Sequence, residues 1–268
     1  PNMPACHIGI AHDARGPNNS LTLGEVSSLA AIAEAMRVIE RGQADAMIAG
    51  GTGSRIHPVI RGRQKIYWPS QQGDDPAAAS RPFDARRDGM VHGEGAGAFV
   101  LEGRDHAQAR GAKAIGRILG YASAFESRPR GAELRGEAIR TAIRAALEDA
   151  GLQPSDVGHV NAHGLSAKVD DELEARAIRD TLGDVPVTAP KSYFGNLAAG
   201  GGAVEMAASM LAFQEGQVPP TLNYEHPDPK CPVNVIHGQP VPLGPPIALM
   251  LNHSRVGQSM AMVVGAAE

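Results

Sequence analysis

The feature that most constrains this chain is an alternation of short apolar runs with longer segments of helical periodicity. Buried strands of α/β proteins read as continuous apolar runs, and helices cover both faces of their sheets. The alternation therefore predicts an α/β fold. Strands are expected at 45–49, 97–101, 114–124, 159–162, 186–189, 247–251 and 260–264, and helices at 25–41, 104–110, 134–150, 170–182 and 203–214.

Three polar residues stand at or just past the ends of predicted strands. They are His163, Lys191 and Asn252. In α/β sheets, ligands bind at the carboxyl ends of the strands. We therefore regard all three as candidates for one functional site.

Residues 55–90 lack a clean period and are rich in Pro, Arg, Asp and Gln. This composition predicts an irregular, mostly exposed excursion that is at best partly helical. Its basic residues Arg81, Arg86 and Arg87 are expected to belong to a solvated charged face.

Charge and composition exclude several classes of protein. The formal charge of −4 gives no basic excess for nucleic acid, and no run of about 18 apolar residues predicts a membrane helix. Two cysteines form no disulfide framework, so a reducing cytoplasm is expected.

The histidines lack metal-ligand spacing, and the glycine-rich run at 93–97 completes no dinucleotide motif, so neither metal nor cofactor is expected. The chain begins at Pro1 and is interpreted as processed, truncated or partly recorded.

Several motifs, in a constant order, resemble those of the β-ketoacyl synthase family. Asn-Ala-His-Gly at 161–164 precedes an acidic helix, and Lys-Ser-Tyr-Phe-Gly-Asn at 191–196 is followed by Gly-Ala-Val-Glu at 202–205. Further matches are Arg-Pro-Phe-Asp at 81–84, Asp-Gly-Met-Val-His-Gly-Glu-Gly-Ala at 88–96 and Val-Pro-Pro-Thr-Leu-Asn at 218–223. These matches cover the whole chain.

The resemblance implies a thiolase-like fold of five α-β-α-β-α layers built from two related halves. Residues 1–110 would be the remainder of the N-terminal half, and residues 111–268 the C-terminal half. The early strands of the first half are not in this sequence, so that half is expected to be incomplete. A longer native protein, or another polypeptide, would then cover the open sheet edge. By the same resemblance, the strand at 45–49 would pair across a dimer axis.

The nucleophile position departs from the family pattern. The family places a cysteine at the start of a buried helix, where the helix dipole favours the thiolate. Aligning the Arg-Gly-Pro turn at 15–17 places Glu25 at that position. Cys6 lies upstream of the turn and is expected to be a small buried core residue.

The other catalytic positions are partly kept. His163 aligns with the first family histidine, and Asn196 replaces the second but can still donate a hydrogen bond to an oxyanion. Lys191 and Glu205 are kept, either as ordering residues of the site or as a purely structural buried pair. His163 also has a purely structural alternative, at the end of a strand.

The C-terminal loop has lost the family's gating phenylalanine. Its substrate and oxyanion positions are Asn252, His253, Val256 and Gly257. His253 and Arg255 are new polar groups, and we expect one of them to pair with Glu25 in the former pocket.

These losses predict a homologue of fatty-acid or polyketide biosynthesis that does not condense acyl chains by itself. By resemblance it would be a chain-length-factor-like subunit that dimerises with a cysteine-containing ketosynthase, or with itself, and meets an acyl-carrier protein. Contact with that protein is the alternative to a solvated face for Arg81, Arg86 and Arg87. Two alternatives remain open. One is a malonyl-thioester decarboxylase that uses His163 and Asn196, and the other is a condensing enzyme with an unrecognised nucleophile.

Overall fold

The computed structural model describes residues 2–61, 68–129 and 132–267. Its strands are β1 (Ala46–Ser54), β2 (Glu94–Glu102), β3 (Gly116–Phe125), β4 (His159–Asn161), β5 (Pro186–Thr188), β6 (Gln217–Val218), β7 (Asn234–Val235), β8 (Val241–Pro242), β9 (Ile247–His253) and β10 (Gln258–Ala266). Its α-helices are α1 (Met3–Ala11), α2 (Ser27–Glu40), α3 (Pro58–Arg61), α5 (Arg104–Ala109), α6 (Glu137–Ala150), α7 (Lys168–Leu182), α8 (Lys191–Phe194) and α9 (Gly201–Glu215). Short 3₁₀ turns include η1 (Gly24–Val26) and η4 (Ala198–Gly200).

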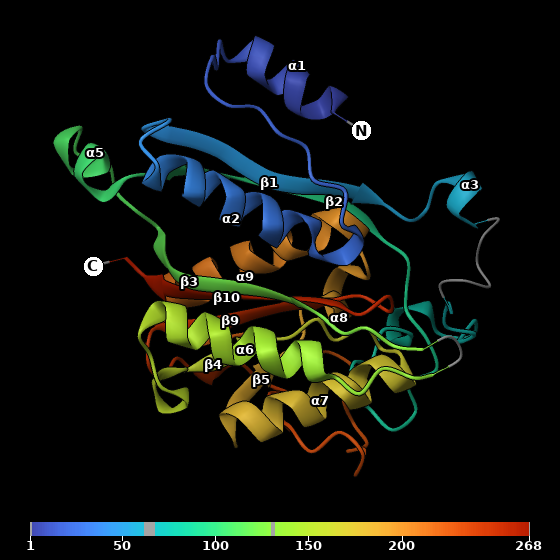
Figure 1. The fold of residues 1–268 in the computed structure, drawn as a ribbon. Coiled ribbons are helices and arrows are strands. Elements are labelled where there is room, and N and C mark those ends of the chain that lie inside the picture. The colour runs from blue at the N-terminus through green and yellow to red at the C-terminus, as the bar shows by residue number, and fades with distance from the viewer. Residues whose placement is uncertain (1, 62–67, 130–131, 268) are drawn as a thin grey trace.

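The described strands form a six-stranded mixed sheet in the order β3-β10-β9-β4-β5-β7, and two-stranded pairs β1-β2 and β6-β8. Helices α2 and α9 lie between the β1-β2 pair and the six-stranded sheet, and α6 and α7 cover the other face of that sheet (Figure 1). Among the described residues, the segment 1–110 contributes the antiparallel β1-β2 pair and helix α2 to this stack.

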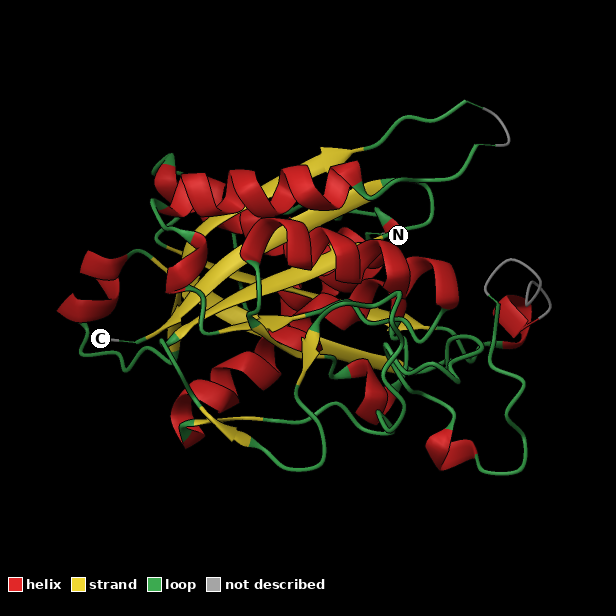
Figure 2. Ribbon diagram, turned by 90° about the horizontal axis from the view of Figure 1, so that it is seen from below, coloured by secondary structure: helices red, strands yellow, loops and turns green. Residues whose placement is uncertain are grey.

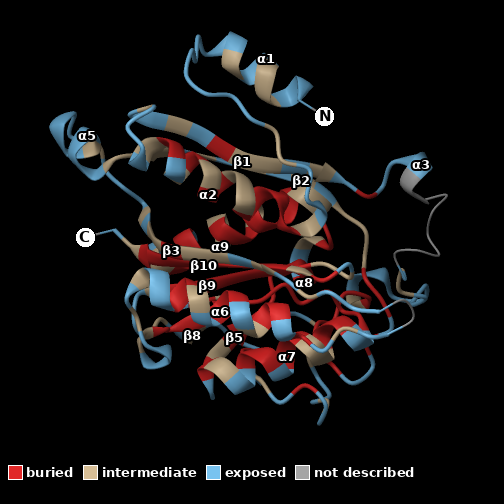
Figure 3. Cartoon of the chain, in the orientation of Figure 1, coloured by how far each residue is buried: buried red, intermediate tan, exposed pale blue. Residues whose placement is uncertain are grey.

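Burial follows this layering, as Figure 3 shows by colour. One core lies between the six-stranded sheet and helices α6 and α7, and a second lies between α2, α9 and the opposite face of the sheet. Helix α1 lies outside the layers and has no buried residue. The turned view in Figure 2 shows long loops gathered at the end of the sheets away from the C-terminus.

The predicted strands and long helices are confirmed, with ends that shift by a few residues. Helix α1, the single-turn helices α3 and α8, and the two-residue strands were not predicted. Such short elements carry too few residues to display a period.

The prediction of an exposed excursion at 55–90 is wrong for Arg55 and for most of residues 79–90. Arg81 and Arg87 are buried, and Phe83 is fully buried in the core under α7. Arg87 forms ion pairs with Asp171 and Asp228, so its charge is compensated away from water. Of the three arginines expected on a charged face, only Arg86 has a substantially exposed side chain. Residues 62–67 of the segment lie outside the described residues.

Candidate functional site

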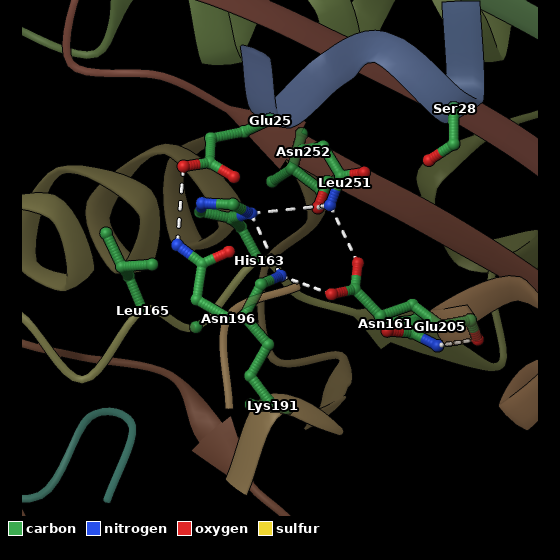
Figure 4. A network of polar contacts seen from close by, with 12 residues as sticks. Glu25, Ser28, Asn161, His163, Leu165, Lys191, Asn196, Glu205, Leu251 and Asn252 are labelled. Carbon is green, nitrogen blue, oxygen red and sulfur yellow. Dashed lines mark hydrogen bonds and ion pairs between the residues drawn. The ribbon is translucent and has the colours of Figure 1, made fainter. Parts of the chain in front are cut away.

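The predicted strand-end residues meet in a buried polar network (Figure 4). Lys191 Nζ donates to His163 Nδ1 at 3.0 Å and forms an ion pair with Glu205. Asn252 Nδ2 donates to Glu205 Oε2 at 2.7 Å and lies 3.3 Å from His163 Nδ1. All four side chains are buried. The structure thus brings His163, Lys191 and Asn252 together, and their role as a functional site stays a prediction.

Secondary structure explains why these residues converge. His163 follows the parallel strand β4, Lys191 begins α8 just after β5, and Asn252 lies in β9, which also pairs with β4. Glu205 stands in the first turns of α9. Gly202 lets that helix start close to β9, because a Cβ at this position would collide with the Asn252 side chain. Four neighbouring elements thus aim their polar groups at one point.

Residues outside this network fix the position of His163. The buried carboxylate of Glu174 in α7 accepts the backbone N–H groups of His163 at 2.7 Å and Gly164 at 2.8 Å. The same carboxylate lies 3.7 Å from His253 Nε2. The rings of His163 and His253 are 4.6 Å apart, so His253 backs the site histidine.

Burial and neighbouring charges shift the pKa values of His163 and His253 in opposite directions. Burial, together with the positive charges of Lys191, His253 and Arg55, holds the pKa of His163 well below its ordinary value. Burial also opposes a charge on His253, but the Glu174 carboxylate outweighs it and raises the pKa of His253. Burial raises the pKa of Glu205, against the opposing effect of Lys191 and Asn252.

Glu25 lies in η1, directly before α2, and its carboxylate points toward Asn196 (Figure 4). The Ser27 hydroxyl fixes this turn, since it accepts the N–H of Leu23 and donates to the Gly24 carbonyl. Asn196 Nδ2 lies 3.3 Å from Glu25 Oε1. The structure therefore brings Glu25, Asn196 and His163 to one place.

The predicted ion pair of Glu25 with His253 or Arg255 is wrong. Glu25 pairs instead with Arg55, and the two side chains are only 11% and 8% exposed. Arg255 turns away to Asp170 in α7, where its Nε donates to Oδ1 at 3.1 Å. The reason is positional, because Arg55 follows the last residue of β1 and so ends beside η1.

Sequence reasoning missed Arg55. It assigned position 55 to an irregular excursion, because the predicted strand stopped at residue 49. The strand runs on to Ser54, so Arg55 is itself a polar residue directly past a strand end. That is the same signal that identified His163 and Lys191.

The C-terminal loop contributes unequally to the site. Asn252 and His253 face it, whereas the Val256 side chain is 64% exposed. Gly257 has φ +98° and accepts the Glu126 N–H at 2.9 Å, so it shapes the turn between β9 and β10. A glycine suits this backbone conformation because a side chain there would be strained.

Neither cysteine of the chain lies among these site residues. Cys6 is a residue of α1 and is partly exposed, so the prediction of a buried core residue is wrong. Cys231 is buried in the core of the second half.

The described residues provide neither a metal site nor a membrane-spanning helix. No group of three or more His, Cys, Asp or Glu side chains there could hold a metal ion. Within the same residues, no helix has both the length and the apolar character needed to cross a membrane.

Two family models together match most of the chain. The model of the β-ketoacyl synthase N-terminal domain matches residues 1–107, and that of the C-terminal domain matches residues 115–225.

Curated relatives agree with these matches. The chain is 41% identical over 244 residues to a 3-oxoacyl-[acyl-carrier-protein] synthase 2 from a Synechocystis species, covering 89% of this chain and 59% of the relative. It is 39% identical over 242 residues to a putative polyketide β-ketoacyl synthase 1 from Streptomyces cyaneus, covering 88% and 57%. The chain thus spans about three fifths of the length of these relatives.

Solved structures share the fold. A type II polyketide acyl-carrier protein in complex with its hexaketide-bound ketosynthase matches at a TM-score of 0.93 and 30% identity, covering 100% of this chain and 67% of the other. The ishigamide ketosynthase/chain length factor matches at 0.88 and 28%, covering 97% and 64%. The fold is therefore the thiolase-like fold that the sequence motifs predicted, and the chain belongs to the β-ketoacyl synthase family of fatty-acid and polyketide biosynthesis.

Proposed function

We propose that this chain is a non-condensing member of the family, which acts as the chain-length-factor-like partner of a cysteine-containing ketosynthase. The observation that carries the proposal is the partly buried Glu25 carboxylate, held by Arg55 and Asn196. Condensation by this family needs a thiolate at that point. A carboxylate in an ion pair is a poor nucleophile for thioester exchange.

The positions of the two cysteines support the proposal. Cys6 is carried by α1, outside the layers, and burial raises the pKa of the Cys231 thiol far above its ordinary value. A thiol whose pKa is raised is rarely the reactive thiolate. Neither residue is therefore a good candidate for an unrecognised nucleophile.

Similarity to a ketosynthase/chain length factor supports the partner role. In this chain Lys191, Glu205, Asn252 and His163 remain connected by hydrogen bonds. A site that keeps these hydrogen bonds but has no nucleophilic cysteine fits a subunit with a structural role rather than a catalytic one. An acyl-carrier protein would be the shared partner of such a pair.

The experiment that tests this role is native mass spectrometry of the complex purified from the source organism. A heterodimer of this polypeptide with a ketosynthase that carries the active-site cysteine is expected. A homodimer that recruits no ketosynthase would contradict the proposed role.

Malonyl-thioester decarboxylation is a second candidate, favoured by one observation. A lone Glu25 carboxylate would repel the malonyl carboxylate, but Arg55 places a positive charge beside it. His163 and Asn196 would then stabilise the enolate that decarboxylation leaves. Release of CO₂ from a malonyl thioester, and its loss in Asn196→Ala, would support this activity.

A further inference from the structure

Several buried polar atoms of the site lack a hydrogen-bond partner among the described residues. Glu25 Oε2 and His163 Nε2 are two of them, and Asn252 Oδ1 and His253 Nε2 are others. Figure 4 shows the Glu25 carboxylate beside the His163 ring, with Asn196 next to both. Buried polar atoms are nearly always hydrogen-bonded. Two such atoms, on side chains that both lie at Asn196 in Figure 4, point to a small polar ligand that contacts both.

The hydrogen bonds of His163 show which of its two ring nitrogens carries the hydrogen. Nδ1 faces Lys191 Nζ and Asn252 Nδ2, which are both donors, so Nδ1 accepts. A neutral imidazole that accepts at one nitrogen carries its hydrogen on the other. The lowered pKa of His163 keeps the ring neutral at neutral pH. Nε2 is consequently an N–H donor, pointed at the site.

The Glu25 carboxylate is divided between two roles. Oε1 is occupied by Arg55 and by Asn196 Nδ2, which leaves Oε2 as the acceptor. The other contact of Asn196 Nδ2 is the Met90 sulfur at 3.5 Å. Sulfur is a weak acceptor, so this amide can turn one N–H to a stronger one. The site thus combines one carboxylate acceptor with two N–H donors.

We propose that Glu25, His163 and Asn196 hydrolyse an acyl thioester without a covalent enzyme intermediate. Glu25 Oε2 takes a proton from water as the water oxygen attacks the thioester carbonyl carbon. The carbonyl oxygen becomes an oxyanion that accepts hydrogen bonds from His163 Nε2 and Asn196 Nδ2. Collapse of the tetrahedral intermediate breaks the C–S bond, and the proton on Glu25 passes to the departing thiolate. One water and one thioester give one carboxylic acid and one thiol.

A thioester fits this set of groups better than an amide. A thiolate leaves without prior protonation, so one carboxylate base is enough, whereas an amine needs a strong acid in addition. Members of the family to which this chain belongs act on acyl groups carried as thioesters. The activity goes beyond the partner role.

The test is thiol release from octanoyl-N-acetylcysteamine, followed with a thiol reagent, using the 268-residue chain alone. Wild type is expected to release thiol above the buffer rate. Glu25→Gln removes the base and is expected to lower the rate about 100-fold or more. Arg179→Ala, an exposed change in α7, is the matched control and is expected to hydrolyse like wild type.

The Gln variant leaves Arg55 without its counter-charge, so its melting temperature is measured as well. If it does not fold, Glu25→Gln/Arg55→Gln, which removes both charges, takes its place. No thiol release by wild type above buffer, or equal rates with and without the Glu25 carboxylate, would overturn the proposal.

Malonyl-N-acetylcysteamine separates hydrolysis from decarboxylation. Hydrolysis gives malonate and thiol, whereas decarboxylation gives CO₂ and an acetyl thioester with no thiol. Because these assays use the isolated chain, their failure would leave the heterodimer result of native mass spectrometry standing, and the reverse also holds.

Discussion

Glu25 and Arg55 form a largely buried ion pair beside Asn196, although thirty residues separate them in the chain. Arg55 is placed there by the end of β1, and Glu25 by the turn before α2. The pair places two compensated charges at this point of the site. Two charges that are removed from water stabilise a fold only while both are present.

Removing one member of this pair should destabilise the protein strongly. Glu25→Ala leaves the Arg55 charge buried, and Arg55→Met leaves the Glu25 charge buried, so each is expected to cost about 3–5 kcal/mol. The double variant should lose less unfolding free energy than the two single variants lose together. Urea unfolding of all three checks this, with Arg179→Ala in an exposed ion pair as a control expected to cost below about 1 kcal/mol. An unchanged unfolding free energy in Glu25→Ala would contradict the account.

The contribution of His253 to stability should depend on pH. Its pKa in the folded state is raised, mainly because Glu174 outweighs the effect of burial. The stabilisation is therefore complete below the unfolded pKa of about 6.5 and is lost as the pH rises through the folded value. The unfolding free-energy difference between wild type and His253→Gln should shrink from pH 6 to pH 8. A difference that grows over this interval would show that the sign is wrong.

The loop between β9 and β10 is fastened by Arg255. Its Nε donates to Asp170, its guanidinium carbon lies 5.5 Å from the centre of the Trp68 ring, and its carbonyl accepts Arg128 Nη2 at 3.2 Å. Arg255→Ala removes an ion pair and a cation–π contact, so amide exchange at 254–257 should become about tenfold faster. Hydrogen exchange followed by mass spectrometry measures this. Equal exchange in wild type and the variant would mean that the loop is held by its backbone alone.

Much of the fold could be predicted because its strands are apolar and its helices are long and amphipathic. Helix α6 buries the apolar stripe that its period indicated, including Ile139, Ile143 and Leu147. The convergence of His163, Lys191 and Asn252 followed from their places at strand ends. Local periodicity and strand-end chemistry were sufficient for these features.

The burial of Arg87 and the partner of Glu25 depend on contacts between segments far apart in the chain, and a local sequence pattern cannot predict such contacts. Arg87 is fully buried because Asp171 and Asp228, far along the chain, compensate its charge. A rule that places arginine at the surface therefore fails here. The partner of Glu25 was misassigned for the same reason, since the choice between Arg55 and Arg255 is decided by where β1 ends and where α7 offers Asp170.

The most direct test of the central claim is the intact mass of the protein after incubation with an acyl thioester. The account predicts that wild type gains no acyl group, whereas Glu25→Cys, with a thiol at the start of α2 beside Arg55, gains one that peptide mapping assigns to position 25. An acyl adduct on the wild-type chain, at Cys6, Cys231 or any other residue, would contradict the claim that this protein does not carry acyl chains itself.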